Sequence, residues 1–291
     1  MSLGQIALGS AVTALFHPTG YSKVLIQLGH EPIEPVLGKS FLGFGKKDVW
    51  YLPNVFKYTR FIYRTEGFFG LYTGLLPRLI GGHLGNFVQQ TVLAELKKDD
   101  AVDEEEQTQE NWIKVVIIQA GKESFARCVG VVASQPFHVL MIRQMAQFVG
   151  GETQYNGLFG GLKEIYNQDG FKGFFSGLVP RLIGEVIQIC LSSVIAELIN
   201  RYIVESKEAQ SYTTGFVGFM ITTFTYPFTL VSNNMAVAGT DLIVASTPNM
   251  KPYIGWTDCY SHLKQTKALG RGSKLFMRTD PRAGSRTFHR F

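Results

Sequence analysis

Charged side chains are scarce in this chain of 291 residues, in which Asp, Glu, Lys and Arg together make up 18%. A soluble domain usually has about 25%. Ala209–Thr240 has none of these four residue types over 32 residues, and Leu3–Ser22 has none either. Because about 20 apolar residues suffice to cross a bilayer, these runs weigh against a soluble helical protein and predict a membrane protein.

The sequence also lacks paired cysteines, a phosphate-binding glycine loop and a hydrolytic triad. Cys128, Cys190 and Cys259 are isolated and form no CxxC pair, so neither a disulfide framework nor a zinc site is indicated. Gly81 and Gly85 form a GxxxG pattern, which is typical of close helix packing rather than of phosphate binding. We therefore expect no cofactor, no metal and no enzymatic activity.

Targeting signals are missing as well, and the few charges are segregated. No basic segment precedes the first apolar run, and no Arg-rich transit peptide is present. Lys97–Asn111 has seven acidic residues in fifteen, whereas the tail after Leu263 has eight Lys or Arg and one acidic residue, Asp280. A solvated loop and a tail lying on anionic lipid account for these segments. The pI near 9.0 therefore does not predict nucleic-acid binding.

What the chain does contain is a repeat of about 100 residues. Residues 67–81 read GFFGLYTGLLPRLIG and residues 170–184 read GFKGFFSGLVPRLIG, an offset of 103 positions. Pro18, Pro136 and Pro227 each lie inside an apolar run, but no third G-L-x-P-R follows Pro227. A fixed period of this kind indicates a repeat architecture. We divide the chain into repeat one (1–97), repeat two (98–203) and a truncated repeat three (204–291).

The apolar pattern predicts an all-α bundle with five transmembrane helices and no sixth. We place them at Leu3–Leu28, Leu75–Leu96, Trp112–Val149, Leu178–Tyr202 and Tyr212–Ala238. Pro18, Pro136 and Pro227 are expected to kink the odd-numbered helices. Short interfacial helices are expected at Phe56–Thr65, Leu158–Gln168 and Trp256–Ala268. The insertion Glu31–Pro53, which is rich in Gly and Pro, is expected to be loop.

Polar residues follow one face of each long helix. A charge at mid-membrane costs about 2.5–3.5 kcal/mol on insertion scales, so such residues face the bundle interior or water. Five polar faces predict a shared cavity, and a missing sixth helix predicts that this cavity is a groove open sideways to lipid. The candidate groove residues are Lys23, Gln27, Glu123, Arg127, His138, Arg143, Glu185, Gln188, Thr229, Asn233 and Asn234.

Simpler roles stay open for several polar residues. Glu123 and Arg127 are four residues apart and could pair along one helix face. Arg181 follows a proline near a helix start and could bind backbone or a lipid phosphate. His17 and His138 adjoin prolines and are expected to be packed as neutral side chains.

These motifs resemble the mitochondrial carrier family, and within it the divergent mitochondrial carrier homologue branch. The stretches KVLIQLGHEP (23–32), GLYTGLLPRL (70–79) and PFHVLMIRQMAQFVG (136–150) carry the resemblance. Carriers place an acidic residue two positions after each odd-helix proline and a basic residue at five. Here Gly20, His138 and Thr229 stand at the acidic positions. We therefore expect that a gate of attractive charge pairs cannot close, and that carrier-type alternating access is lost.

The resemblance implies a multi-pass protein of the mitochondrial outer membrane that inserts tail-anchored and other α-helical membrane proteins. It also implies alternatives: phospholipid scrambling through the same groove, or a receptor or scaffold for an apoptotic BH3-type protein. Residual solute transport is a further hypothesis, which would need a sixth helix supplied from elsewhere. The expected partners are thus membrane-protein clients, phospholipids and a BH3-type protein, with no nucleic acid.

Overall fold

A computed structural model of the chain describes residues 3–39, 48–98, 112–204 and 206–279. Most of the acidic segment Lys97–Asn111 and the end of the basic tail lie outside these residues. The helices are α1 (Leu3–Leu28), α2 (Val55–Gly70), α3 (Leu75–Lys98), α4 (Trp112–Ala146), α5 (Leu158–Gly173), α6 (Leu178–Tyr202), α7 (Lys207–Val237) and α8 (Trp256–Gln265). Two 3₁₀ turns, η4 (Gln147–Val149) and η5 (Ile243–Ala245), and strands β1 (Val36–Lys39), β2 (Asp48–Leu52) and β3 (Arg278–Thr279) complete the fold.

The predicted long helices are all present, and the three prolines lie inside α1, α4 and α7. The bounds of α1 and α6 agree with the prediction. Helix α7 begins earlier than expected, because Ser206 caps it by accepting a hydrogen bond from the Ala209 amide at 3.2 Å. Gly67 and Gly170 have non-helical backbone angles inside α2 and α5.

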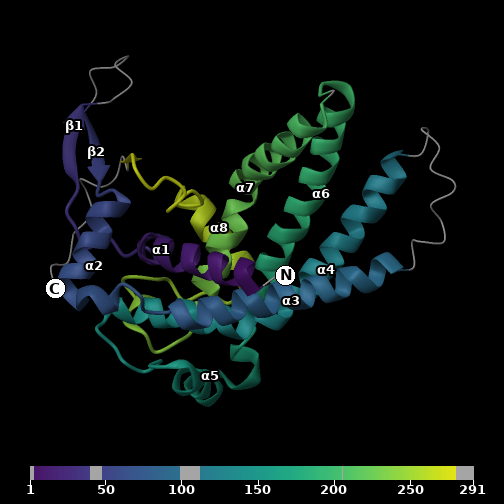
Figure 1. The fold of residues 1–291 in the computed structure, drawn as a ribbon. Helices are drawn as coiled ribbons and strands as arrows, with labels where there is room; N and C mark the ends of the chain where they lie inside the picture. Colours follow the sequence, from purple (N-terminus) through teal and green to yellow (C-terminus); the bar gives the residue numbers. More distant parts are fainter. Residues whose placement is uncertain (1–2, 40–47, 99–111, 205, 280–291) are drawn as a thin grey trace.

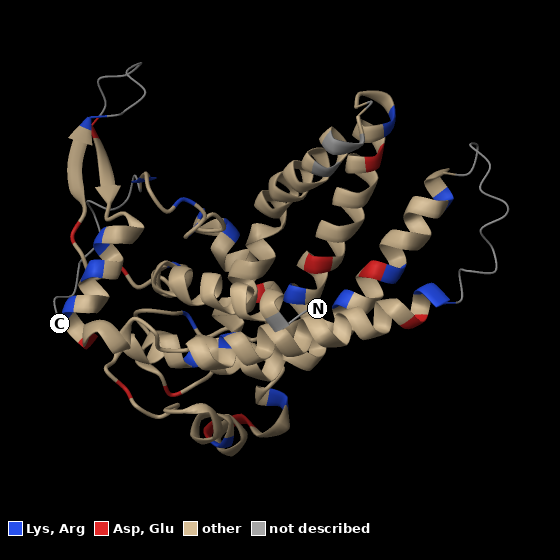
Figure 2. Cartoon of the chain, viewed as in Figure 1, with Lys and Arg blue, Asp and Glu red and all other residues tan. Residues whose placement is uncertain are grey.

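Three segments in the described part of the chain are long and apolar enough to cross a membrane: Trp112–Val149, Leu178–Tyr202 and Tyr212–Val237. Helices α1 and α3 have 26 and 24 residues, which is also enough length, but they are less apolar. Figure 2 shows that the long helices carry few charges, whereas the short helix α2 carries several. The chain is an all-α membrane protein, and the spanning of α1 and α3 stays a prediction.

Two helical hairpins build the bundle (Figure 1): α3 lies against α4, and α6 lies against α7. Glycines permit the close contact of the first pair. A Cβ on Gly130 would lie 2.5 Å from the Gly85 carbonyl oxygen, and one on Gly81 would lie 2.9 Å from the Phe137 Cβ. The GxxxG pattern therefore serves packing within the chain, as predicted.

The short helices α2, α5 and α8 cover one end of the bundle. Helix α2 starts at Asn54, whose side chain accepts a hydrogen bond from the Lys57 amide at 2.9 Å. Its Tyr58 and Ile62 are fully buried against the C-terminal half of α1, and Ile165 of α5 joins the same core. In α8, burial raises the pKa of the Cys259 thiol to about 12, so this cysteine is not a reactive thiolate.

The expectation that Glu31–Pro53 is loop was wrong. Within it, β1 and β2 pair antiparallel, with Val36 opposite Tyr51, and β3 adds a third strand beside β2. The strand residues are rich in Val, Trp and Tyr, which favour sheets. The β1–β2 pairing is local, and the Gly and Pro content of the segment masked it, whereas β3 lies more than 200 positions away in the sequence.

Candidate functional site

A polar cavity of about 380 Å³ lies where the five long helices meet. Each helix contributes at least one basic or hydroxyl side chain to its lining, among them Lys23, Arg78, Arg127, Arg181 and Thr229. A neighbouring cavity of about 190 Å³ lies between α4, α6 and α7 and shares His138, Arg181, Thr229 and Asn233 with the first. The five polar faces therefore converge on one connected space.

Eight of the eleven candidate groove residues line one or both cavities. They are Lys23, Gln27, Arg127, His138, Glu185, Gln188, Thr229 and Asn233. The other three, Glu123, Arg143 and Asn234, do not, and each departs from the prediction for its own physical reason.

Glu123 is exposed on α4 and makes no pair with Arg127. Arg127 turns instead to α6, where its Nε and Nη2 donate to the Glu185 carboxylate at 2.9 and 3.1 Å. Its Nη1 also donates to Gln89 of α3 at 3.1 Å. A bidentate pair across two helices satisfies the guanidinium better than a partner on its own helix. The local Glu123–Arg127 alternative is thereby excluded.

Arg143 is fully buried and does not face the groove. Its guanidinium donates to the Ala236 carbonyl at 2.9 Å, to the Tyr155 hydroxyl at 3.2 Å and to Asp169 at 2.5 Å. These bonds join α4 to α7, to the loop before α5 and to α5 itself. Arg143 is therefore a structural residue that lies outside the cavity. Periodicity placed it on the polar face of α4, but periodicity does not say how deep along the helix the cavity lies.

Asn234 is fully buried beneath the cavity wall. Its amide donates to the Gln27 carbonyl at 3.2 Å and to the Leu230 carbonyl of its own helix at 2.7 Å. Its side-chain oxygen accepts from Arg271 at 3.1 Å. The neighbouring Asn233 is the member of this pair that reaches the cavity.

A chain of hydrogen-bonded neutral side chains joins α4, α7 and α1 at one end of the cavity, which we call its floor. The His138 ring nitrogen lies 3.2 Å from the Asn233 side-chain oxygen. Asn233 donates to the Gln27 side chain at 2.8 Å, and Gln27 donates to the Tyr226 hydroxyl at 3.0 Å. Lys23 lies 5.3 Å from the centre of the Tyr226 ring. Buried amides, rather than the charge pairs expected in carriers, therefore join the helices at this end. The loss of carrier-type alternating access stays a prediction.

Several functional positions were absent from the sequence-based set. Arg78 lines the large cavity and is the repeat equivalent of Arg181, 103 positions earlier. The shared P-R dipeptide was the signal that could have identified it. Tyr226 gave no comparable signal, since its role depends on partners from other helices.

One contact recurs in all three repeats. The residue before each odd-helix proline donates to a carbonyl just ahead of a glycine: His17 to Thr73 at 2.9 Å, Gln135 to Ser176 at 2.9 Å, and Tyr226 to Arg271 at 2.6 Å. The glycines that follow, Gly74, Gly177 and Gly272, all have positive φ, the region that favours glycine. In repeats one and two a long helix then starts. In repeat three the same turn forms, and the chain continues as an extended tail.

This tail, Arg271–Thr279, returns to repeat one. Arg271 donates from Nε and Nη2 to the Gln27 carbonyl at 2.9 and 2.5 Å. Further along, the Val55 amide donates to the Leu275 carbonyl at 2.8 Å, and buried Arg278 pairs with Glu31. The tail thus joins repeat three to repeat one at the floor of the cavity.

We expect Arg271→Ala to lower the free energy of unfolding by about 1–3 kcal/mol, because it leaves the Asn234 side-chain oxygen without its buried donor and the Gln27 carbonyl with the Asn234 amide alone. Thermal unfolding in detergent, together with hydrogen exchange of the tail amides, measures this effect. Lys274→Ala is the matched control, since Lys274 is exposed on the same tail. Equal behaviour of the two variants would show that the tail contact contributes nothing to stability.

Comparison with known proteins identifies this architecture. The family model for the mitochondrial carrier protein matches residues 2–99 and 122–207. Mitochondrial carrier homolog 2 from Mus musculus and from Homo sapiens are each 38% identical over 287 residues, covering 95% of this chain and 94% of the relative. The chain belongs to the mitochondrial carrier homologue family. Mitochondrial carrier homolog 1 from Mus musculus is 34% identical over 300 residues, covering 94% of this chain and 75% of the relative.

Membership places the chain in a mitochondrial membrane, in a family whose members are generally transporters rather than enzymes. Both stretches matched by the carrier model fall on repeats one and two. Repeat three departs from the carrier pattern after Gly272, where the second long helix would start.

The pseudo-symmetry of the carrier fold shows which faces of the described helices a sixth helix would cover. In α4, Ser134 and Gly130 lie two and six residues before Pro136. Both are buried against Gly85 of α3. The equivalents in α7, Thr225 and Ile221, are buried too, at 4% and 7% exposure.

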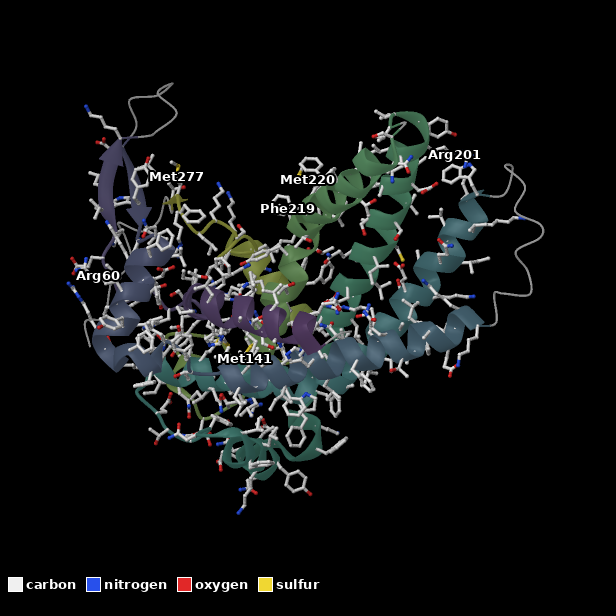
Figure 3. All side chains as sticks on the ribbon, in the orientation of Figure 1. Arg60, Met141, Arg201, Phe219, Met220 and Met277 are labelled. Atoms are coloured by element: carbon white, nitrogen blue, oxygen red, sulfur yellow. The ribbon has the colours of Figure 1, made fainter. Side chains whose placement is uncertain are left out.

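The equivalents in α1 have no such cover. Phe16 and Val12 are 59% and 48% exposed. The hydrogen bonds and ring contact that join α1 to α7 come from Lys23 and Gln27, near the floor. On α7, Phe219 and Met220 point away from α6 (Figure 3) and are exposed. Above the floor, the cavity is therefore flanked by an uncovered apolar face of α1 and another of α7, which we call the open face.

Proposed function

We propose that this protein is an insertase of the mitochondrial outer membrane for tail-anchored and other α-helical membrane proteins. The observation that supports the proposal is the combination of a polar cavity with the open face, at the position of a missing carrier helix. A carrier that surrounds its cavity completely can move a solute. An incompletely surrounded cavity gives a second chain access from the side.

The energetic problem of insertion is the polar end of the client. Each unsatisfied polar group in hydrocarbon costs several kcal/mol. Lys23, Asn86 and Asn233 line the cavity and can donate hydrogen bonds to such a segment. The cavity therefore replaces water for the client's polar residues while they are at membrane depth.

The client's apolar helix needs the opposite environment. Val12 and Phe16 of α1 and Phe219 of α7 are exposed apolar side chains beside the cavity. A helix that contacts them can keep its polar end in the cavity and move directly into lipid. No covalent step or nucleotide is required for this transfer.

Cross-linking in liposomes tests where the client binds. We start from a variant in which Cys128, Cys190 and Cys259 are replaced by alanine, and add Val12→Cys or Phe16→Cys. A single-cysteine tail-anchored client is expected to cross-link to these positions several-fold more than to Ile221→Cys, the buried equivalent of Val12 on α7. Equal yields at all three positions would contradict a client on the open face.

Activity is measured in the same liposomes. Insertion of the client by the purified protein alone should exceed the insertion into protein-free liposomes. If it does not, the insertase proposal fails for the isolated chain.

A second candidate is phospholipid scrambling, because the cations of the cavity lie beside the open face and could lead a headgroup across while its acyl chains stay in lipid. A fluorescent-lipid assay on the same liposomes separates it from insertion. The receptor role for a BH3-type protein stays a prediction that rests on the family resemblance alone. The open side is also unfavourable for solute transport by the chain alone.

A further inference from the structure

The charge balance of the large cavity is one-sided. Its lining includes four basic residues and no acidic one: Lys23, Arg78, Arg127 and Arg181. Glu185 lines the neighbouring cavity, and its carboxylate is held by Arg127 on both oxygens. Three cations are thereby left in the cavity without an ion pair among the described residues.

Two of these three are arginines in equivalent positions of repeats one and two. The Arg181 Nη1 donates to the Gln135 side chain at 2.7 Å, and the Arg78 Nη1 donates to the His17 ring at 3.4 Å. His17 uses its other ring nitrogen to donate to the Thr73 carbonyl, so it can accept from Arg78 only as a neutral ring. Both arginines therefore contact neutral partners, which leave most of their N–H donors available.

The position that could neutralise Arg78 from inside the chain is a glycine. A Cβ on Gly20 would lie 2.7 Å from the Arg78 Nη1. Any carboxylate side chain at this position would reach the guanidinium, yet none is present. In the second repeat the equivalent position is His138, which is occupied by its contact to Asn233.

Unpaired charges at membrane depth are costly unless a counter-ion or water satisfies them. Guanidinium groups suit phosphate, because they present a planar fork of donors that matches two oxygens. We infer that the cavity is a binding site for a phosphate group, held by Arg78 and Arg181 with Lys23 as the third cation. The phosphate could belong to a free dianion or to the headgroup of an anionic phospholipid.

Binding is tested with inorganic pyrophosphate, by calorimetry on the full chain purified in neutral detergent. We expect saturable binding of one pyrophosphate per chain. Arg78→Gln and Arg181→Gln should each raise the Kd at least tenfold, whereas Arg60→Gln, an exposed arginine on α2 (Figure 3), should leave it unchanged. Non-saturable binding, or the same Kd in all three variants, would overturn the inference.

A second variant distinguishes loss of the phosphate site from misfolding of the protein. Gly20→Asp removes no cation but supplies a carboxylate beside Arg78, and the flexible guanidinium can move to make room for it. It should weaken pyrophosphate binding by a similar factor while the unliganded melting temperature stays near that of the parent chain. Unchanged pyrophosphate binding in a folded Gly20→Asp protein would also overturn the inference.

The source of the phosphate is decided in nanodiscs. The titration is repeated in phosphatidylcholine alone and in phosphatidylcholine with phosphatidic acid. Suppression of pyrophosphate binding by phosphatidic acid supports the site and assigns it to a lipid headgroup. Unaltered binding supports the site and assigns it to a free anion. Client insertion is a separate measurement, so loss of this inference would leave the proposed function in place.

Discussion

Glu185→Arg is expected to reduce client insertion at least tenfold. Glu185 supplies the carboxylate that neutralises Arg127, and the two side chains are 22% and 31% exposed. The substitution would place a third guanidinium beside Arg127 and beside Arg181, one turn away on α6. Breaking a buried pair costs 3–5 kcal/mol, and with this partial exposure we expect about 1–3 kcal/mol of lost stability. Insertion of a tail-anchored client into liposomes measures the functional effect.

The matched control is Glu123→Arg, which makes the same charge change on an exposed position of α4. It should leave insertion within twofold of the parent chain, because Glu123 is outside the cavity. Combining Arg127→Glu with Glu185→Arg restores a pair in the opposite orientation and should recover stability. Equal losses in Glu123→Arg and Glu185→Arg would mean that net charge, rather than the cavity, controls insertion.

Arg143→Leu is expected to have the largest effect on stability. Arg143 is fully buried, and three elements depend on its hydrogen bonds to Ala236, Tyr155 and Asp169. Removing one partner of a buried ion pair typically costs about 3–5 kcal/mol, because the other charge stays behind. Unfolding of the purified protein in detergent, followed by circular dichroism, measures the loss.

Repeat one suggests how to separate the charge effect from packing. The position equivalent to Arg143 in α1 is Leu25, which is also fully buried. An apolar side chain is therefore compatible with this site in the fold. Adding Asp169→Asn to Arg143→Leu should recover part of the stability, since no unpaired carboxylate remains. A single variant as stable as Arg60→Leu would show that Arg143 contributes little.

The long helices could be read directly from the sequence. Predominantly apolar runs gave α1 and α6 at their observed bounds, because the bilayer imposes both length and apolar character on a helix. The 103-residue repeat likewise indicated the carrier architecture before any contact was known. Polar periodicity then identified eight residues that line the cavities, although not at which depth each would lie.

Apart from the local β1–β2 hairpin, the errors concern partners that are distant in the sequence. Arg127 pairs with Glu185 rather than with the nearby Glu123, and β2 pairs with β3 from the opposite end of the chain. Periodicity assigns a residue to a face of its helix, but it does not say which helix stands opposite or at what height. For the same reason, Arg143 and Asn234 were assigned to the groove although they are buried below it.

The sequence by itself determined the membrane class and the carrier family, and it predicts three repeats of which the third has no second long helix. Each of these depends on composition or on a pattern within one segment. Only the tertiary structure decided that amides of Gln27 and Asn233 close the floor, that the tail returns to repeat one, and that Phe16 is uncovered. These features arise from packing between segments, whose free energy depends on which surfaces meet in space.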